Sequence, residues 1–159
     1  MNDFKIFRAI PDLCTGCQRC ELVCSLNKTG SVNPVFSRIK VRPASHDAEC
    51  SILMCRHCRV PVCREACPVP EAMYQDDRTG AVVIDEEKCI GCRACADACP
   101  FEAIQIGPEG EVLKCDLCGG NPACVTYCQD RPEKQFPGLP YPKASCLEYV
   151  EPHKITRKC

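Results

Sequence analysis

Apolar and polar positions along the chain form short runs rather than long periodic stretches. Alternation over 4–10 and 38–41 predicts two strands, and the apolar run 81–84, which follows the Thr79-Gly80 turn signal, predicts a third. Residues 103–106 and 112–113 bracket the turn-forming segment 107–110, which indicates a hairpin. A short helix is expected over 19–26, where helix breakers are few, with its end between Asn27 and Gly30. The pattern favours an α+β fold built from short elements.

The composition changes what can fill the interior of such a fold. The 159 residues include 19 Cys, five Phe and four Tyr, but no Trp. A chain of this length is expected to form one compact domain, yet few large side chains are available to pack its centre. We therefore expect inorganic clusters to occupy that centre.

The cysteines fall into four groups of four. The run Cys89–Pro100 has two, two and three residues between its cysteines and ends in proline, as in bacterial ferredoxins. Cys14–Cys24 has the same spacing without the proline, whereas Cys55–Cys67 has four residues in its middle gap, which calls for a bulged loop. The last group, Cys115–Cys128, is looser. In two loops the residue before the second cysteine is glycine, which can take a positive φ and turn backbone N–H groups toward the cluster sulfurs.

The spacing also predicts which cysteines share a cluster, because the fourth cysteine of such a run reaches the cluster of the paired run. Four 4Fe-4S clusters with crossed ligands are therefore expected. The inner pair of clusters would be held by Cys55, Cys58, Cys63 and Cys99, and by Cys67, Cys89, Cys92 and Cys95. The outer pair would be held by Cys14, Cys17, Cys20 and Cys128, and by Cys24, Cys115, Cys118 and Cys124.

Zinc is the alternative for these cysteines. The fourth group, taken alone, also fits a zinc site built from two knuckles, but runs of four cysteines at two, two, three spacing do not. Cys50, Cys146 and Cys159 fall outside every group and are interpreted as buried or free thiols. His57 lies between two ligands and is interpreted as a group that tunes the adjacent cluster, rather than as a ligand.

Several arginines stand beside predicted ligands, where they either raise cluster potentials or face solvent or a partner: Arg19, Arg56, Arg59, Arg64 and Arg93. No catalytic residues are expected. The sequence has no Ser/His/Asp set, phosphate loop or dinucleotide glycine motif, and a cluster with four thiolates has no open position for a substrate.

The domain organisation follows from the crossed ligands. A four-cluster domain over 1–128 is predicted to consist of two pseudo-symmetric ferredoxin-like modules. The inner module covers about 50–106, and the outer module combines 12–49 with 107–128. Prolines interrupt residues 129–159, which are predicted to form an extended arm that lies either on a partner subunit or over the chain's own clusters.

Charge and hydropathy narrow the environment of the protein. The net charge is −1 with no basic block, which argues against nucleic acid and anionic membranes and favours a protein partner. The first residues lack an apolar run of signal-peptide length, no twin-arginine pair precedes the first cysteine, and no stretch approaches the roughly 18 apolar residues of a membrane span. A cytoplasmic protein without direct membrane insertion is therefore expected.

The four cysteine groups, in this order, resemble the four-cluster ferredoxin subunits of the dimethyl sulfoxide reductase type. The resemblance covers about 12–128 and includes Cys55-Arg56-His57-Cys58 and Lys114-Cys115-Asp116-Leu117-Cys118. It implies a non-catalytic subunit that relays electrons between a catalytic subunit and a second redox partner.

The short connections are most similar to the small polyferredoxins of tungsten aldehyde oxidoreductases. That resemblance implies a tungsten–pterin catalytic subunit, with an FAD-containing NAD-reducing subunit or a ferredoxin as the second partner. Three alternatives remain: an iron–sulfur subunit of a molybdopterin enzyme, hydrogenase or carbon monoxide dehydrogenase; a free-standing polyferredoxin; and a zinc-stabilised interaction module. A further hypothesis is that copies of the relay subunit stack end to end into a longer electron-conducting chain.

Overall fold

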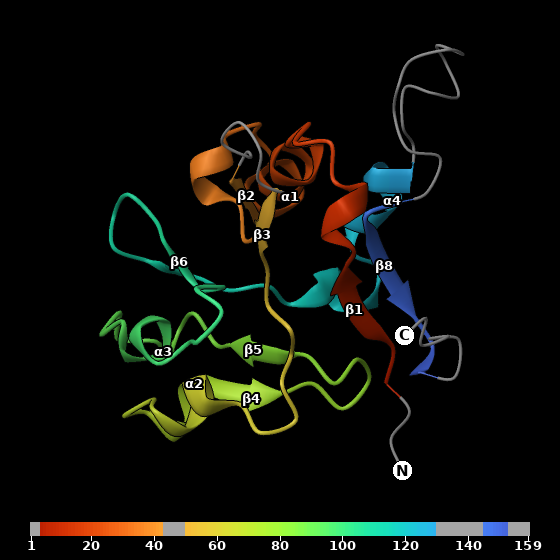
Figure 1. Cartoon of the computed structure of the whole chain (residues 1–159). Coiled ribbons are helices and arrows are strands. Elements are labelled where there is room, and N and C mark those ends of the chain that lie inside the picture. The colour runs from red at the N-terminus through yellow and green to blue at the C-terminus, as the bar shows by residue number, and fades with distance from the viewer. Residues whose placement is uncertain (1–3, 43–49, 130–144, 153–159) are drawn as a thin grey trace, which may run out of the picture.

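The computed structural model describes residues 4–42, 50–129 and 145–152, which form short helices and two-stranded sheets (Figure 1). The helices are α1 (Arg19–Thr29), α2 (Val62–Glu65), α3 (Ala94–Asp97) and α4 (Ala123–Gln129). The strands are β1 (Ile6–Ala9), β2 (Lys40–Arg42), β3 (Ser51–Leu53), β4 (Met73–Gln75), β5 (Val82–Ile84), β6 (Gln105–Ile106), β7 (Val112–Leu113) and β8 (Leu147–Val150). The expected α+β class is confirmed at this level.

The strands form four antiparallel pairs, which are β1 with β8, β2 with β3, β4 with β5, and β6 with β7. A two-stranded ribbon is only marginally stable by itself in water. Each pair must therefore gain its stability from packing against the rest of the chain.

The predicted helix is present as α1, and its end has a clear local cause. Gly30 has a φ of 73°, and its N–H donates to the carbonyl of Leu26 at 2.9 Å. Glycine reaches this left-handed conformation without the steric penalty of a side chain, so it ends the helix where the sequence predicts. Cys24 and Ser25 lie on the buried side of the helix, and α1 packs against α4.

Two hydrophobic cores support the cysteine loops. The first joins elements from both ends of the chain and contains Phe7, Cys24, Ile39, Met54, Ala81, Leu117, Cys124, Val125, Cys146 and Leu147. The second lies within the middle of the chain and contains Met73, Val82, Cys95, Ile104 and Val112. Buried cysteines belong to both cores, so the cysteine loops are part of the packed interior.

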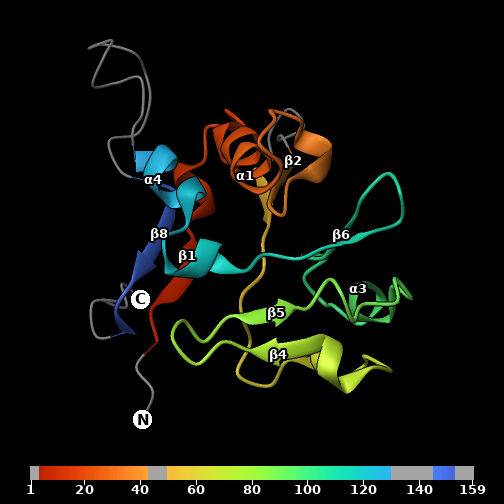
Figure 2. The ribbon, with the colours of Figure 1, turned by 180° about the vertical axis from the view of Figure 1, so that it is seen from behind.

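The elements separate into two groups in space. Figure 1 shows α1, β2, β3, α4, β1 and β8 in one part of the molecule and α2, α3, β4 and β5 in the other, and the view from behind in Figure 2 agrees. The segment that leads from β3 and the segment that follows β7 connect the two groups. No helix within the described ranges is long and apolar enough to cross a membrane.

The predicted strands over 4–10, 38–41 and 81–84 correspond to β1, β2 and β5, and the predicted hairpin is β6–β7. Strands β3, β4 and β8 were not predicted. β8 falls in the predicted arm, of which the structure describes Gln129 and 145–152, and it pairs with the chain's own β1. The described part of the arm therefore lies on the N-terminal strand of the same chain.

Candidate iron–sulfur cluster sites

The four cysteine loops share one backbone feature, which is a positive φ at the residue before the second cysteine. This residue is Gly16 (φ 67°), His57 (φ 45°), Gly91 (φ 68°) or Leu117 (φ 56°). The N–H of His57 points to the sulfur of Cys55, and that of Leu117 to the sulfur of Cys115, each at 3.5 Å. Gly16 likewise donates its backbone N–H to Cys14. The expected positive φ at the two glycines is confirmed, and the same turn occurs at two bulkier residues.

The structure brings together each of the four predicted cysteine sets around a cavity of its own. The first cavity is lined by Cys14, Cys17, Cys20 and Cys128, the second by Cys24, Cys115, Cys118 and Cys124, the third by Cys55, Cys58, Cys63 and Cys99, and the fourth by Cys67, Cys89, Cys92 and Cys95. Their empty space is similar, between about 320 and 370 Å³ each, including the part open to solvent.

The fourth cysteine of each run lies away from its own run. Cys128 lines the first cavity with the N-terminal loop, and Cys24 lines the second. Cys67 and Cys99 are exchanged in the same way between the third and fourth cavities. The cysteines from 115 to 128 therefore do not enclose one common space, as the zinc interpretation of that group requires. Across 4–42, 50–129 and 145–152, no group of three or more His, Cys, Asp or Glu side chains is placed to hold a single metal ion.

Without iron, burial favours the neutral form of the cysteine thiols that line the cavities. It raises the pKa of Cys115 to about 12 and that of Cys95 to about 11, and it raises the pKa values of Cys20 and Cys124 further. Neighbouring cysteines add to the shift, because two thiolates close together repel each other. Bound iron would offset the free-energy cost of placing several thiolates close together in a buried space. Because thiolates are soft donors, this arrangement fits an iron–sulfur cluster.

A buried lysine lies between the second and third cavities. The Nζ of Lys114, a residue that is 4% exposed, donates to the sulfur of Cys55 at 3.3 Å and to the carbonyl oxygens of Val82 and Cys115. The same side chain lines the third cavity. A positive charge is thus held against a predicted ligand of one cluster, next to the first ligand of another.

His57 is a neutral member of the third cavity wall. Its Nδ1 accepts the N–H of Val82 at 3.1 Å, while its buried Nε2 has no hydrogen-bond partner among the described residues. Burial, helped by the charge of Lys114, lowers its pKa to about 3. Because Nδ1 accepts, Nε2 carries the proton, and an unpartnered donor in a cavity wall fits a cluster sulfur as its acceptor.

An ion-pair network ties α1 to the loop of the second cavity. Lys28 contacts Asp116 at 2.6 Å, and Arg38 lies 3.9 Å from the same carboxylate. Burial raises the pKa of Asp116, but Lys28, the N–H of Cys118 and Arg38 together outweigh burial and lower it. The backbone N–H of Arg38 also donates to the sulfur of Cys24 at 3.3 Å. These contacts hold α1 against the loop that begins at Cys115, and these two segments supply cysteines of the second cavity.

The arginines beside the ligands have different surroundings. Arg56 lies over the ring of Phe101 at 4.4 Å from its centroid, and both residues line the third cavity. Arg19 and Arg93 line the first and fourth cavities. Arg59 is exposed, as are Cys17 of the first set and Cys92 of the fourth. The first and fourth cavities therefore present a ligand at the surface.

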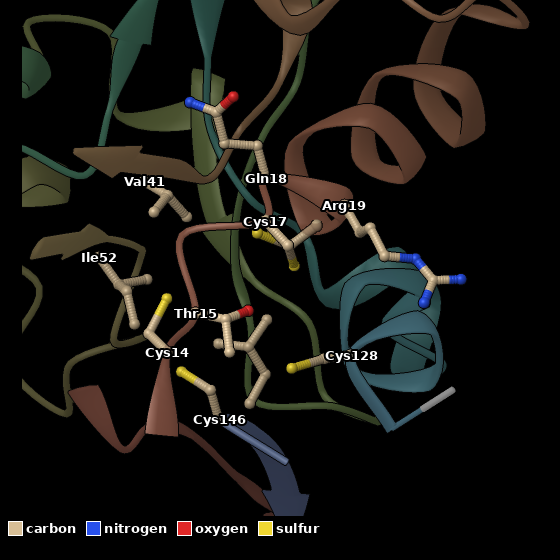
Figure 3. A pocket seen from close by; sticks show the side chains of 11 residues that line it. Cys14, Thr15, Cys17, Gln18, Arg19, Val41, Ile52, Cys128 and Cys146 are labelled. Atoms are coloured by element: carbon tan, nitrogen blue, oxygen red, sulfur yellow. The ribbon is translucent and has the colours of Figure 1, made fainter. Parts of the chain in front are cut away.

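Sequence reasoning missed two members of these walls. The sequence pattern assigns no role to Lys114, and it places Cys146 outside the four groups as a buried or free thiol. Cys146 lines the first cavity, and Figure 3 shows its side chain beside that of Cys14. No local spacing links Cys146 to the other cysteines, so only the fold brings it there.

Comparison with known proteins identifies the family. A family model described as a 4Fe-4S dicluster domain matches residues 48–134, and one described as a 4Fe-4S binding domain matches residues 11–30. The chain belongs to the 4Fe-4S dicluster domain family.

Three relatives show the setting of this family. The polyferredoxin-like subunit of an aliphatic sulfonate oxidoreductase from Pyrococcus furiosus is 45% identical, over 76% of this chain and 69% of that protein. The beta subunit of an NADH-dependent phenylglyoxylate dehydrogenase from Aromatoleum evansii is 36% identical, over 74% of this chain and 27% of that protein. The B subunit of the anaerobic dimethyl sulfoxide reductase of Escherichia coli is 35% identical, over 72% of this chain and 64% of that protein. The chain thus spans less than two thirds of the latter two.

These relatives are subunits of oxidoreductases, and the dimethyl sulfoxide reductase resemblance is confirmed at the family level. The chain is an iron–sulfur electron-transfer subunit of this type, not a catalytic one. A tungsten aldehyde oxidoreductase as its particular partner stays a prediction.

Proposed function

We propose that this chain holds four 4Fe-4S clusters, one in each cysteine-lined cavity, and relays single electrons through them. The observation that carries the proposal is the agreement between cavity and sequence: each cavity is lined by the four cysteines that the crossed-run rule groups together. Such crossed ligation would tie residues 12–49 to residues 107–128 in an outer ferredoxin-like module, with about 50–106 as the inner module.

The cavities lie in a linear order that suits a relay. Cysteines of successive sets are near enough to interact electrostatically, and the pairs are Cys20 with Cys124, Cys115 with Cys55, and Cys63 with Cys95. The order is therefore first, second, third, fourth cavity. Exposed Cys17 and Cys92 belong to the two terminal sets, so electrons would enter at one end and leave at the other.

The catalytic partner we favour is a tungsten–pterin aldehyde oxidoreductase, because the short connections between cysteine groups resemble its small polyferredoxin. Electrons would then pass to an FAD-containing NAD-reducing subunit or to a ferredoxin. The similarity to the B subunit of dimethyl sulfoxide reductase favours the second candidate, a subunit of a molybdopterin enzyme. Exposed terminal clusters would also allow copies to associate end to end. We place this complex in the cytoplasm.

Metal analysis of the natively purified complex under anaerobic conditions tests this proposal. About four irons per cluster, hence about sixteen per chain after subtraction of the partner's own, with tungsten alongside, is the expected result. Molybdenum in place of tungsten would move the partner to the molybdopterin branch. Zinc without acid-labile sulfide would refute the relay itself.

A further inference from the structure

The first cavity differs from the other three because its wall contains a fifth thiol. Cys146 lines it together with Cys14, Cys17, Cys20 and Cys128, whereas four cysteines line each of the other cavities among the described residues. The additional cysteine is 3% exposed and belongs to the first hydrophobic core. Figure 3 shows its side chain beside that of Cys14 in the wall of this cavity.

The strand pair β1–β8 fixes the distance between Cys146 and Cys14. Ala9 of β1 is in register with Leu147 of β8, and the N–H of Ile10 donates to the carbonyl of Cys146 at 2.8 Å. The chain then makes one tight turn, closed by the N–H of Cys14 donating to Pro11 at 2.7 Å. The hydrogen-bonded pair β1–β8 therefore holds Cys14 and Cys146 close to each other.

Cys14 and Cys146 lie beside each other in the wall of the first cavity, as Figure 3 shows. Cys50 packs over the loop, since a Cβ added at Gly16 would lie 3.3 Å from its sulfur. It does not line the cavity, whereas Cys146 does. Of the two extra thiols, Cys146 is the one that already faces the space where iron would bind.

We infer that Cys146 is a reserve ligand of the first cluster, paired with Cys14. This inference rests on the proposed four-cluster function. While Cys14 binds iron, the thiol of Cys146 donates a hydrogen bond to its sulfur. In the exchange, the bond between Cys14 and iron would break, one between Cys146 and the same iron would form, and the proton of Cys146 would pass to Cys14. The oxidation state of the cluster does not change.

The position of the first cluster gives the reserve ligand a use. Cys17 is exposed, so this terminal cluster is open to oxidants that reach the end of the relay. Thiolate ligands are lost when they are oxidised. A second thiol beside Cys14 would keep the cluster attached at that iron if the bond between iron and Cys14 were lost.

The test compares iron content and EPR spectra of anaerobically purified full-length variants. Cys14→Ala is expected to keep the wild-type iron content with a changed EPR signal, whereas Cys14→Ala/Cys146→Ala loses iron from that cluster. Cys115→Ala is the matched control, because it removes the first ligand of a cavity without a fifth thiol. It is expected to lose iron as the double variant does.

Equal iron loss in Cys14→Ala and the double variant would overturn the inference. A second measurement needs no ligand removal: Cys146→Ala should lower the potential of one cluster, because a hydrogen bond to sulfur is lost, and Cys146→Ser should restore it. An unchanged potential in both would also contradict the pairing. A wild-type protein without about sixteen irons would instead refute the proposed function, so the two failures are distinguishable.

Discussion

Replacing Lys114 by methionine removes a buried positive charge at the centre of the proposed relay while keeping an unbranched side chain of similar length. Its Nζ lies 3.3 Å from the sulfur of Cys55 and contacts the carbonyl of Cys115. Reduction of a cluster adds one negative charge, which a nearby cation stabilises. Loss of this cation is therefore expected to make the third cluster harder to reduce.

The size of the effect follows from the geometry. The added electron spreads over the cluster, so its mean distance from Nζ exceeds the 3.3 Å contact with the ligand sulfur. Two unit charges about 6 Å apart interact by roughly 2.8 kcal/mol at an effective dielectric constant of about 20. Because about 1.4 kcal/mol corresponds to about 59 mV for one electron, the potential should fall by on the order of 100 mV.

A redox titration followed by EPR measures this shift. Lys114→Arg keeps the charge and should stay near the wild-type potential. Lys5→Met is the surface control, because Lys5 is 47% exposed and pairs with Glu151 near the N-terminus. A shift below about 30 mV in Lys114→Met, one quarter of the Coulomb estimate, would refute the electrostatic role of this lysine.

Three further variants test separate parts of the account. His57→Phe removes the unpartnered Nε2 donor and should lower the potential of one cluster, which the same titration detects; a rise would contradict the donor role. Gly16→Ala and Gly30→Ala place a side chain at similar positive φ, but only at Gly16 does the new Cβ meet a sulfur within 3.3 Å. Gly16→Ala should therefore lose its cluster absorbance at a lower denaturant concentration than Gly30→Ala. Equal denaturation midpoints for the two variants would count against the close packing of the loop at Gly16. Met73→Ala empties a core position that is 1% exposed and should cost about 2–5 kcal/mol in anaerobic unfolding; a loss below about 0.5 kcal/mol, as at ordinary surface sites, would disprove its core role.

The cysteines that line each cavity could be grouped from the sequence because cluster-binding runs have fixed spacings. The glycine turns at Gly16 and Gly91 followed from the same reasoning, since glycine signals a positive φ. The identical turns at His57 and Leu117 did not, because neither residue favours that conformation. They are seen only when the position within the loop is compared across all four groups.

Strand pairing was harder to predict than the ligands. Strands β3 and β4 are as short as β2 and β5, with three residues each, but buried and exposed positions do not alternate along β3 or β4. Strand β8 pairs with β1 from the opposite end of the chain, a long-range contact that local pattern does not encode. Cys146 was placed beside Cys14 by that pairing, and its position could not be derived from spacing.

The most direct test of the central claim is to locate iron by anomalous scattering in crystals of the anaerobically prepared protein. The account predicts four separate iron sites, one inside each cavity, with Cys128 beside the N-terminal loop and Cys24 beside the loop that begins at Cys115. Fewer than four iron sites, or a site enclosed by the four cysteines from 115 to 128 alone, would contradict it.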